Sequence, residues 1–345
     1  MTPYGSTPKN KRTAICRILI WLTMNLSVIV VNWFSRDALR RCVGSLLQHC
    51  RGIQLEVIVV DNGSFDGSRD LLLREFSSVI YVQSEANLGL AGGNNLGAKH
   101  ATGDHLLFMH SDVELVENSL SALLEKMKFL KDAGAVGCQL LNPDRTNQTG
   151  SVRAFPTIIN QVLDSEYLRE RFPDSKLWGD RMVHAAWSRH TEVDAVSAAC
   201  ILVRRNCFEQ IGGFNEKLFV AGAEVDLCFR LRAVGRLVYF VPETHVIHHG
   251  GSTHPSRVLT VGYRQATYQF ISRNRGPLTA MTYRGAIALS ALLRLIFIPP
   301  LMPLGKTFVR HGKASWLKWY SVLKWSLGLL ESEPTRPSGS TAAAP

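Results

Sequence analysis

From Leu26 onward, short runs of β-branched residues alternate with segments that have the hydrophobic spacing of amphipathic helices. The runs "SVIVVNW", "LEVIVVD" and "HLLFMH" predict buried strands, and "RDALRRCVGSLLQHC" and "GSRDLLLREF" predict helices between them. This order predicts an α/β fold in which helices cover both faces of a mainly parallel sheet. A chain of 345 residues can bury one large core of this kind, or two modest ones.

Polar or glycine-rich residues follow the expected strands. They are Asn32, residues 61–64, residues 87–93 and residues 111–114. In open α/β sheets, ligands bind beyond the carboxyl ends of the strands. The sequence therefore predicts a cleft at that edge of the sheet.

Two of these segments, "VVDNGSFDGS" and "NLGLAGGNNLG", have features of nucleotide-binding loops. The Asp61 carboxylate, at a strand tip, can accept hydrogen bonds from a pyrimidine ring or a ribose. Alternatively, this is an ordinary loop in which Asp66 or Ser68 caps the next helix. The second segment lacks the G-x-G-x-x-G spacing, so we expect a flexible segment whose backbone amides, with Asn94 or Asn95, approach a diphosphate. A helix is expected over "NNLGAKHA". Glycines that merely allow close packing would give the same pattern.

"HSDVE" at residues 110–114 brings a carboxylate, that of Asp112, to the same edge. A Mg²⁺ or Mn²⁺ ion that bridges two phosphates needs only one or two protein oxygens, because phosphates and waters supply the rest. Asp112 can hold such an ion, or it can simply form a turn. "HVIHHGGS" adds His245, His248 and His249 beside a glycine turn. One of these histidines can be a further metal or phosphate ligand, although lone histidines are usually structural.

"AEVDLCFRLR" at residues 223–232 predicts a helix whose first turn carries Glu224. Glu224 shares a stripe with the apolar residues at i+3, i+4 and i+7, so it faces the interior or a cleft. Burial would favour the protonated form of this carboxyl group, whereas the helix dipole would favour the ionised form, and the sequence leaves both open. Asp226 and Arg230 share another face of the helix and can form an ion pair.

In this order, the segments resemble the inverting family-2 glycosyltransferases with the GT-A fold, and in particular the bacterial rhamnosyltransferase-like group. The resemblance covers roughly residues 26–275 and rests on "SVIVVNW", "VIVVDNGSFDGS", "NLGLAGGNNLGAKHATGDHLLFMHSDVEL", "GGFNEKLFVAGAEVDLCFRLRAVG" and "HHGGST". It implies transfer of a sugar, with inversion, from a nucleoside-diphosphate sugar to a saccharide or a lipid-linked saccharide. The implied process is the synthesis of bacterial surface polysaccharide.

The resemblance also implies roles for the matching residues. Glu224 would be the catalytic base, Asp226 and Arg230 would lie on the acceptor side, and Asp112 and His248 would bind Mg²⁺ or Mn²⁺. The residues expected to contact the nucleotide sugar, with Asp61 at its base or ribose, are Asn32, Asp61, Asn62, Gly63, Ser64, Asn87, Gly92, Asn94, Asn95 and Ser111.

Two departures from the family pattern bear on activity. His110 and Ser111 stand where the metal-binding element has its first carboxylate, and Ala223 precedes Glu224 where a pair of acids is usual. These departures motivate a second hypothesis, a catalytically silent relative that binds glycan or nucleotide as a scaffold. A third hypothesis is a nucleotidylyltransferase on a similar fold. The sequence lacks the glycine-rich, arginine-containing loop that such an enzyme is expected to have at the first strand.

Positive charge gathers towards the C-terminus. The formal net charge is +11, and residues 244–330 contain eleven Lys and Arg but no Asp or Glu. The run "RGAIALSALLRLIFIPPLMPL" is apolar, but Arg294 and three prolines interrupt it, and Trp319 and Trp325 lie among lysines beyond it. This mixture is typical of the headgroup region of a membrane. We therefore expect residues 285–330 to contact the cytoplasmic leaflet peripherally rather than span it, with a basic helical packing domain as the alternative.

A nucleic-acid partner is not expected, because the aromatic residues accompany long aliphatic runs. We expect an extension over residues 1–23, a GT-A domain over 24–254, a helical region over 255–330 and a disordered tail over 331–345. The extension can be non-native sequence, a surface helix or a cleaved signal peptide. The seven cysteines form no C-x-x-C pair, which predicts reduced thiols in a cytoplasmic protein at the inner face of the membrane.

Overall fold

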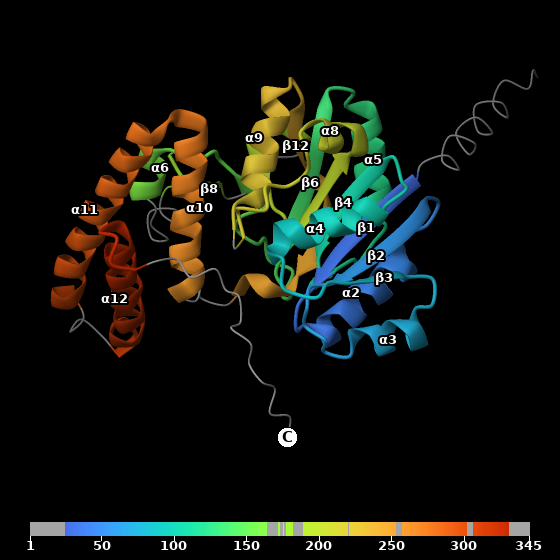
Figure 1. Cartoon of the computed structure of the whole chain (residues 1–345), viewed down its shortest axis with the longest axis horizontal. Coiled ribbons are helices and arrows are strands. Elements are labelled where there is room, and N and C mark those ends of the chain that lie inside the picture. Colours follow the sequence, from blue (N-terminus) through green and yellow to red (C-terminus); the bar gives the residue numbers. More distant parts are fainter. Residues whose placement is uncertain are drawn as a thin grey trace, which may run out of the picture.

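The computed structural model describes residues 25–163, 172, 175, 177–181, 189–219, 221–252, 257–301 and 306–330. Within these residues, a mixed sheet with helices on both faces forms one body, and three long helices form a group beside it (Figure 1). The predicted α/β fold is therefore confirmed. The predicted extension over residues 1–23 and the tail over 331–345 lie outside the described residues, and the domain boundaries stay predictions.

One large sheet runs through the body. Its strands are β1 (Asn25–Asn32), β2 (Gln54–Asp61), β3 (Ile80–Gln83), β4 (His105–His110), β5 (Val113–Glu114), β6 (Ala133–Leu141), β9 (Thr191–Glu192), β11 (Cys200–Arg204) and β12 (Leu237–His248). They are ordered β3-β2-β1-β4-β11-β6-β12-β5, and β9 pairs with β12. β1 to β4 run parallel, as do β6 and β12, whereas β11 lies antiparallel between β4 and β6. The sheet is mostly parallel, as predicted, with one reversed strand inside it.

Strand β1 shows why helices cover both faces of the sheet. Successive side chains of a strand point to opposite faces. Val28 and Val30 accordingly join one buried cluster, and Ile29 and Val31 join another. The first cluster includes residues of α2 (Arg36–His49), α3 (Ser68–Glu75) and α5 (Ser119–Phe129), and the second includes residues of α4 (Gly89–His100), α8 (Arg205–Gln210) and α9 (Ala223–Ala233).

The glycine-rich segment forms helix α4, so the prediction of a flexible segment is wrong. Glycine is a poor helix former, but here the helix lies very close to the sheet. A Cβ atom at Gly93 would lie 2.8 Å from a methyl carbon of Val31, and one at Gly97 would collide with Ile29. The glycines are therefore needed for close packing, which was the alternative explanation of the pattern.

The stretch that the sequence left irregular, residues 151–190, contributes to a small second sheet. Its strands are β7 (Val152–Arg153), β8 (Asp180–Arg181) and β10 (Ala195–Val196), in the order β10-β7-β8. A short helix, α6 (Ile158–Val162), follows β7. The strand before β7 in the sequence, β6, and the strand after β10, β11, both belong to the main sheet. The small sheet, with β7, is therefore held close to the carboxyl edge of the main sheet.

β12 contains an irregularity that matters for the site. It pairs with β6 in parallel register up to Val241, and the register shifts before pairing resumes at His245. Residues 242–244 therefore bulge out of the ladder. Beyond the bulge, His248 at the end of β12 pairs with Val113 of β5.

Three long helices follow the sheet body: α10 (Arg257–Arg275), α11 (Pro277–Leu301) and α12 (Lys306–Ser326), after the 3-10 turn η1 (His249–Ser252). They pack on one another, and α6 lies against α11 (Figure 1). Within the described residues, α11 extends to Leu301 and includes Pro299 and Pro300. Over Pro277–Phe297, α11 is the one described helix that is long and apolar enough to cross a membrane, with a mean hydropathy of 1.3.

The tryptophans of α12 lie inside this helical group. Trp319 is 6% exposed and Trp325 is 2% exposed, so the prediction that they sit at headgroup level is wrong. The guanidinium of Arg294 lies 4.0 Å from the centre of the Trp319 ring, and it donates to the Val162 carbonyl at 3.0 Å. Arginine and tryptophan thus form internal packing here, as the alternative of a basic helical packing domain implies.

Candidate functional site

Three polar side chains meet at the carboxyl edge of the sheet: those of Asp112 and His248, which were predicted to bind metal, and that of His110. His110 ends β4, Asp112 follows it, and His248 ends β12. One ligand atom of each lies within 4.8 Å of the others. The pairing of β12 with β5 brings the two distant segments together.

The electrostatics of this cluster suit a cation. Burial raises the pKa of Asp112, but hydrogen bonding to His248 and the charges of both histidines outweigh it, so the pKa lies below its usual range. Burial lowers the pKa of His110 to about 4. The charges of the nearby His248 and Arg153 lower this pKa further, and the charge of Asp112 raises it. At neutral pH, His110 is therefore a neutral imidazole beside a carboxylate, the protonation states in which both residues bind metal.

One further observation tests whether a metal ion fits. The Nε2 atom of His110 is buried and has no hydrogen-bond partner within the described part of the chain. A buried polar atom of this kind normally has a partner. Two imidazole nitrogens and a carboxylate oxygen form a donor set for a divalent transition metal. The residues present fit such an ion.

Glu224 lies in the first turn of α9, as predicted, and it is 5% exposed. Its Oε1 accepts a hydrogen bond of 2.7 Å from Nη1 of Arg153, on β7. The charge of Arg153 also reaches His110. Arg153 thus connects the candidate base to the histidine–aspartate cluster.

The predicted pairing of Asp226 with Arg230 is confirmed, with 2.7 Å between Nε and Oδ2. Asp226 is buried, and Nη1 of Arg230 donates to the carbonyl of Ile211 at 2.7 Å. The pair therefore ties α9 to the loop after α8. An acceptor-side role for these two residues stays a prediction.

On the nucleotide side, Asn32 organises the first loops. Its amide nitrogen donates to Ser64, Asp66 and Ser68, and its oxygen accepts from Ser35 at 2.8 Å. The same Ser35 hydroxyl lies 2.8 Å from the hydroxyl of Ser111. These contacts bring the ends of β1, β2 and β4 together, as the sequence predicted.

Asp61 is 1% exposed, and both of its oxygens are engaged. It accepts hydrogen bonds from the Ser64 backbone at 3.0 Å and from the Ser64 hydroxyl, and from the Phe65 backbone and the Tyr81 hydroxyl at 3.2 and 3.1 Å. Asp66 accepts from the Ser68 backbone at 3.1 Å, but the N-cap residue of α3 is Gly67, so the alternative that Asp66 or Ser68 caps this helix is wrong. The Asp61 carboxylate therefore shapes the loop, and direct contact with a nucleotide stays a prediction.

The second nucleotide loop packs against the first. Asn62 donates to Asn87 at 2.9 Å and to the carbonyl of Gly89 at 3.1 Å. Gly63 has φ +76°, and a Cβ atom there would lie 2.7 Å from the backbone of Ala86. Only glycine fits this turn. Asn94 is buried in the adjoining helix together with Gly92, and its Oδ1 has no hydrogen-bond partner within the described segments.

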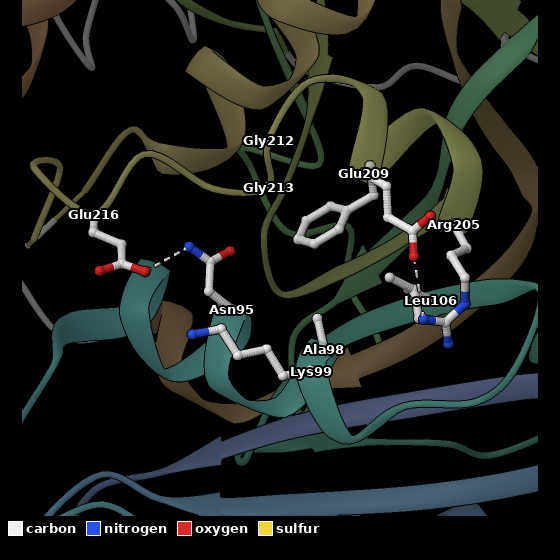
Figure 2. A pocket seen from close by; sticks show the side chains of 10 residues that line it. Asn95, Ala98, Lys99, Leu106, Arg205, Glu209, Gly212, Gly213 and Glu216 are labelled. Carbon is white, nitrogen blue, oxygen red and sulfur yellow. Dashed lines mark hydrogen bonds and ion pairs between the residues drawn. The ribbon is translucent and has the colours of Figure 1, made fainter.

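Asn95 faces a different hollow. It lines a cavity of about 350 Å³ between α4, α8 and the following loop, together with Lys99, Arg205 and Glu209 (Figure 2). The Asn95 amide donates to the Phe214 carbonyl and to Glu216, each at 2.9 Å. None of the three candidate metal ligands lines this cavity. Asn95 therefore lies in a cavity apart from the candidate metal ligands, and its contact with a diphosphate stays a prediction.

The sequence did not point to His110, Gln148 or Arg153. His110 was considered only as a missing carboxylate, although its position two residues before Asp112 puts both at the same strand end. Gln148 bonds His248 at 2.7 Å across 100 residues of sequence, and Arg153 bonds Glu224 across 71. No local pattern signals either contact.

Several known proteins are similar to this chain in sequence. The O-antigen biosynthesis protein RfbC of Myxococcus xanthus is 32% identical over 229 residues, which are 66% of this chain but only 17% of that protein. The N-acetylglucosaminyl-diphospho-decaprenol L-rhamnosyltransferase of Mycobacterium tuberculosis is 28% identical over 291 residues, covering 79% of this chain and 93% of that protein. Rhamnosyltransferase WbbL of Escherichia coli is 22% identical over 265 residues, covering 72% of this chain and 93% of that protein.

Solved structures share the fold. The mannosyltransferase PcManGT from Pyrobaculum calidifontis, in complex with GDP-Man and Mn²⁺, has a TM-score of 0.55 at 16% identity and covers 93% of this chain and 95% of that one. GalNAc-T7 with UDP, GalNAc and Mn²⁺ has a TM-score of 0.52 at 15% identity and covers 74% and 51%. The family model "Glycosyl transferase family 2" matches residues 27–210, more than half of the chain. The chain is therefore a member of glycosyltransferase family 2, with the hexosyltransferase type of activity.

Proposed function

We propose that this glycosyltransferase moves a sugar, with inversion, from a nucleoside-diphosphate sugar to a saccharide or lipid-linked saccharide acceptor. The observation that carries the proposal is the cluster of His110, Asp112 and His248, together with the ion pair of Glu224 with Arg153, whose charge acts on the pKa of His110. The relatives named as L-rhamnosyltransferase and O-antigen biosynthesis protein support a role in bacterial surface polysaccharide synthesis, with rhamnose as the first donor sugar to test.

We infer that Mn²⁺, rather than Mg²⁺, is the preferred ion. His110, Asp112 and His248 would hold it. Mg²⁺ takes oxygen ligands almost entirely, whereas imidazole nitrogen suits transition metals. When bound, the ion supplies Lewis-acid stabilisation of the negative charge that develops on the departing diphosphate.

Glu224 is proposed as the base. Its carboxylate would take the proton of the acceptor hydroxyl while that oxygen forms a bond to the anomeric carbon and the bond from this carbon to the diphosphate breaks. Burial of Glu224 keeps bulk water away from the proton transfer. A single displacement inverts the configuration at the anomeric carbon. Asp226 and Arg230 would border the acceptor from the same helix.

The loops that contain Asn32, residues 61–66 and residues 87–89 would receive the nucleotide. We propose that Asp61 acts by shaping its loop, because both of its oxygens are engaged. The backbone groups of the loop, and the Asn94 side chain from α4, would then face the base, ribose or diphosphate.

The acceptor side would lie towards the membrane. Because Trp319 and Trp325 are buried, they do not support membrane contact by residues 285–330, but the surface of α11 does. Its outward face is apolar and exposed along the helix, at Leu278, Met281, Leu289, Leu292, Leu293, Ile296 and Phe297. Arg273 and Arg275 are exposed at the preceding turn. An amphipathic face of this kind, with basic residues beside it, favours peripheral binding to the cytoplasmic leaflet.

A catalytically silent relative is the second candidate, because Ala223 precedes Glu224 and Arg153 engages its carboxylate. Incubation with a panel of nucleoside-diphosphate sugars, with Mn²⁺ or Mg²⁺, and measurement of released nucleoside diphosphate separates the two. We expect release with one donor, faster with Mn²⁺. Nucleotide binding without release under any condition would favour the silent relative.

A further inference from the structure

A short segment, residues 148–153, contacts both halves of the proposed site. Gln148 at its start bonds His248, and Arg153 at its end bonds Glu224. The segment is held firmly between these contacts. The backbone N–H of Gln148 donates to the Leu140 carbonyl at 2.9 Å. The hydroxyl of the fully buried Ser151 accepts from the backbone N–H of Leu140 at 3.0 Å.

Gln148 decides which nitrogen of His248 carries the proton. The Nε2 atom of Gln148 donates to the His248 carbonyl at 3.1 Å and to Oδ1 of Asn142 at 3.0 Å. Its Oε1 must therefore be the atom that lies 2.7 Å from Nδ1 of His248. An amide oxygen only accepts, so Nδ1 is the donor and carries the proton.

The other ring nitrogen of His248 faces the cluster. Nε2 lies 3.3 Å from Oδ1 of Asp112. With the proton on Nδ1 committed to Gln148, Nε2 is the nitrogen presented for metal binding. A hydrogen bond to the second nitrogen is the usual means by which proteins orient a ligating histidine.

Arg153 orients the base in a corresponding way. Its Nη1 holds Oε1 of Glu224 at 2.7 Å, which leaves Oε2 for an acceptor hydroxyl. The strand of Arg153 is paired on both sides, to β10 and to β8, so the guanidinium has a fixed origin. Its charge also reaches His110 in the metal cluster.

We propose that Gln148 and Arg153 are positioning residues that keep the metal-binding half and the base of the site in register, through one segment. The inference rests on the proposed function, because it takes His248 as a metal ligand and Glu224 as the base. Neither positioning residue would touch the reacting atoms.

The Gln148 half is tested with Mn²⁺ alone, titrated into the full chain and followed by electron paramagnetic resonance. We expect Gln148→Leu to weaken Mn²⁺ binding by about 10- to 100-fold, the usual effect of removing such a contact. Gln148→Glu keeps an acceptor for Nδ1 but loses the donor to Asn142 and to the His248 carbonyl, so it should bind Mn²⁺ more tightly than Gln148→Leu and more weakly than the parent protein. Unfolding temperatures of both variants control for misfolding. Equal Mn²⁺ affinity in Gln148→Leu and the parent protein would overturn this half.

The Arg153 half is tested by turnover with the donor found in the sugar-nucleotide screen. Arg153→Leu should lower kcat by about 100-fold, as expected when a base is misaligned, with little change in KM for the donor. Arg153→Lys keeps a single charged donor and should recover part of kcat. Mn²⁺ affinity should not fall in either variant, because the removed or replaced side chain is a cation. A raised KM with normal kcat would overturn this half.

Two reference variants separate failure of the inference from failure of the proposed function. Asp112→Ala should abolish Mn²⁺ binding, and Glu224→Gln should abolish turnover. If either reference variant behaves like the parent protein, the proposed function fails. If both behave as expected while Gln148→Leu and Arg153→Leu are normal, only the positioning roles are wrong.

Discussion

The sheet body and the helical group use arginine differently. In the body, Arg153 bonds a buried carboxylate at the edge where polar loops meet. In the helical group, Arg284 donates to the carbonyls of Trp325 and Ser326 at the end of α12, and Arg294 lies against Trp319. The same residue type holds a buried carboxylate in one region and completes packing in the other. Charge content alone therefore does not reveal which residues face a ligand or a membrane.

The largest expected effect tests whether chemistry belongs to the sheet body. Glu224→Gln preserves shape and removes the base, so turnover should fall by about 10²- to 10⁴-fold while nucleoside-diphosphate binding is unchanged. Rates of nucleoside-diphosphate release and calorimetric titration measure the two quantities. Glu216→Gln, a carboxylate in the cavity of Figure 2, is the matched control and should remain active. Normal turnover of Glu224→Gln would reject its assignment.

The next effect tests whether the helical group has a tryptophan core. Trp325→Ala should lower the free energy of unfolding by about 3–5 kcal/mol, because it empties a packed site. It also removes the 2.8 Å hydrogen bond from the indole to Gln265. Urea unfolding measures the change. Trp316→Ala, which removes a stack on the exposed Tyr320, should cost much less. A variant that kept its stability but lost membrane binding would restore the original headgroup interpretation.

A pH effect should distinguish the sheet edge from the helical group. His110 has a pKa of about 4 in the folded protein, against an ordinary value of 6.5, because it is buried. The unfolded chain therefore binds more protons between these values, and the metal-free protein should lose about 2–3 kcal/mol of stability as pH falls from 6.5 to 4. Chemical unfolding across this range measures the loss. His110→Gln should show a shallower dependence, and identical pH profiles would contradict the burial of a neutral imidazole.

The smallest effect on stability concerns the outer face of α11. Met281→Ser with Leu289→Ser should change the free energy of unfolding by less than about 0.5 kcal/mol per site, because both side chains are exposed. Binding to vesicles of anionic phospholipid, measured by co-sedimentation, should nevertheless fall several-fold. Phe129→Ser, which removes a 74% exposed side chain from the sheet body, is the matched control. Equal binding of all three proteins would count against the α11 surface.

The strands and helices of the body could be predicted, because alternation along β1 and helical spacing along α9 report burial directly. Asp112, His248 and Glu224 could be named as candidates from their places at element ends and from the family resemblance, and their roles stay predictions. The second half of α4, in "NNLGAKHA", was predicted as helix, but its glycine-rich start was predicted to be flexible because glycines lower helix propensity. The decisive factor is a close approach to Ile29 and Val31. That factor belongs to the tertiary structure.

The remaining site residues could not be found for a related reason. Gln148 and Arg153 act through partners that are far away in sequence, and nothing in "NQTGSVRAF" marks them. In the helical group, composition identified apolar and basic residues correctly but could not assign them to the inside or the outside. Helix–helix packing decides that, and it turned Trp319 and Trp325 inwards.

The bulge at residues 242–244 has a consequence for how the cluster could be lost or acquired. The number of residues in the bulge fixes the register of β12 after the bulge. It therefore determines which of Ile247, His248 and His249 lies at the position beside Asp112. If Thr244 instead of His245 paired with Gln139, the bulge would be one residue shorter and Ile247 would take the place of His248, although every candidate ligand remained in the sequence. The length of this irregular tripeptide thus sets whether an imidazole or an aliphatic side chain lies beside Asp112.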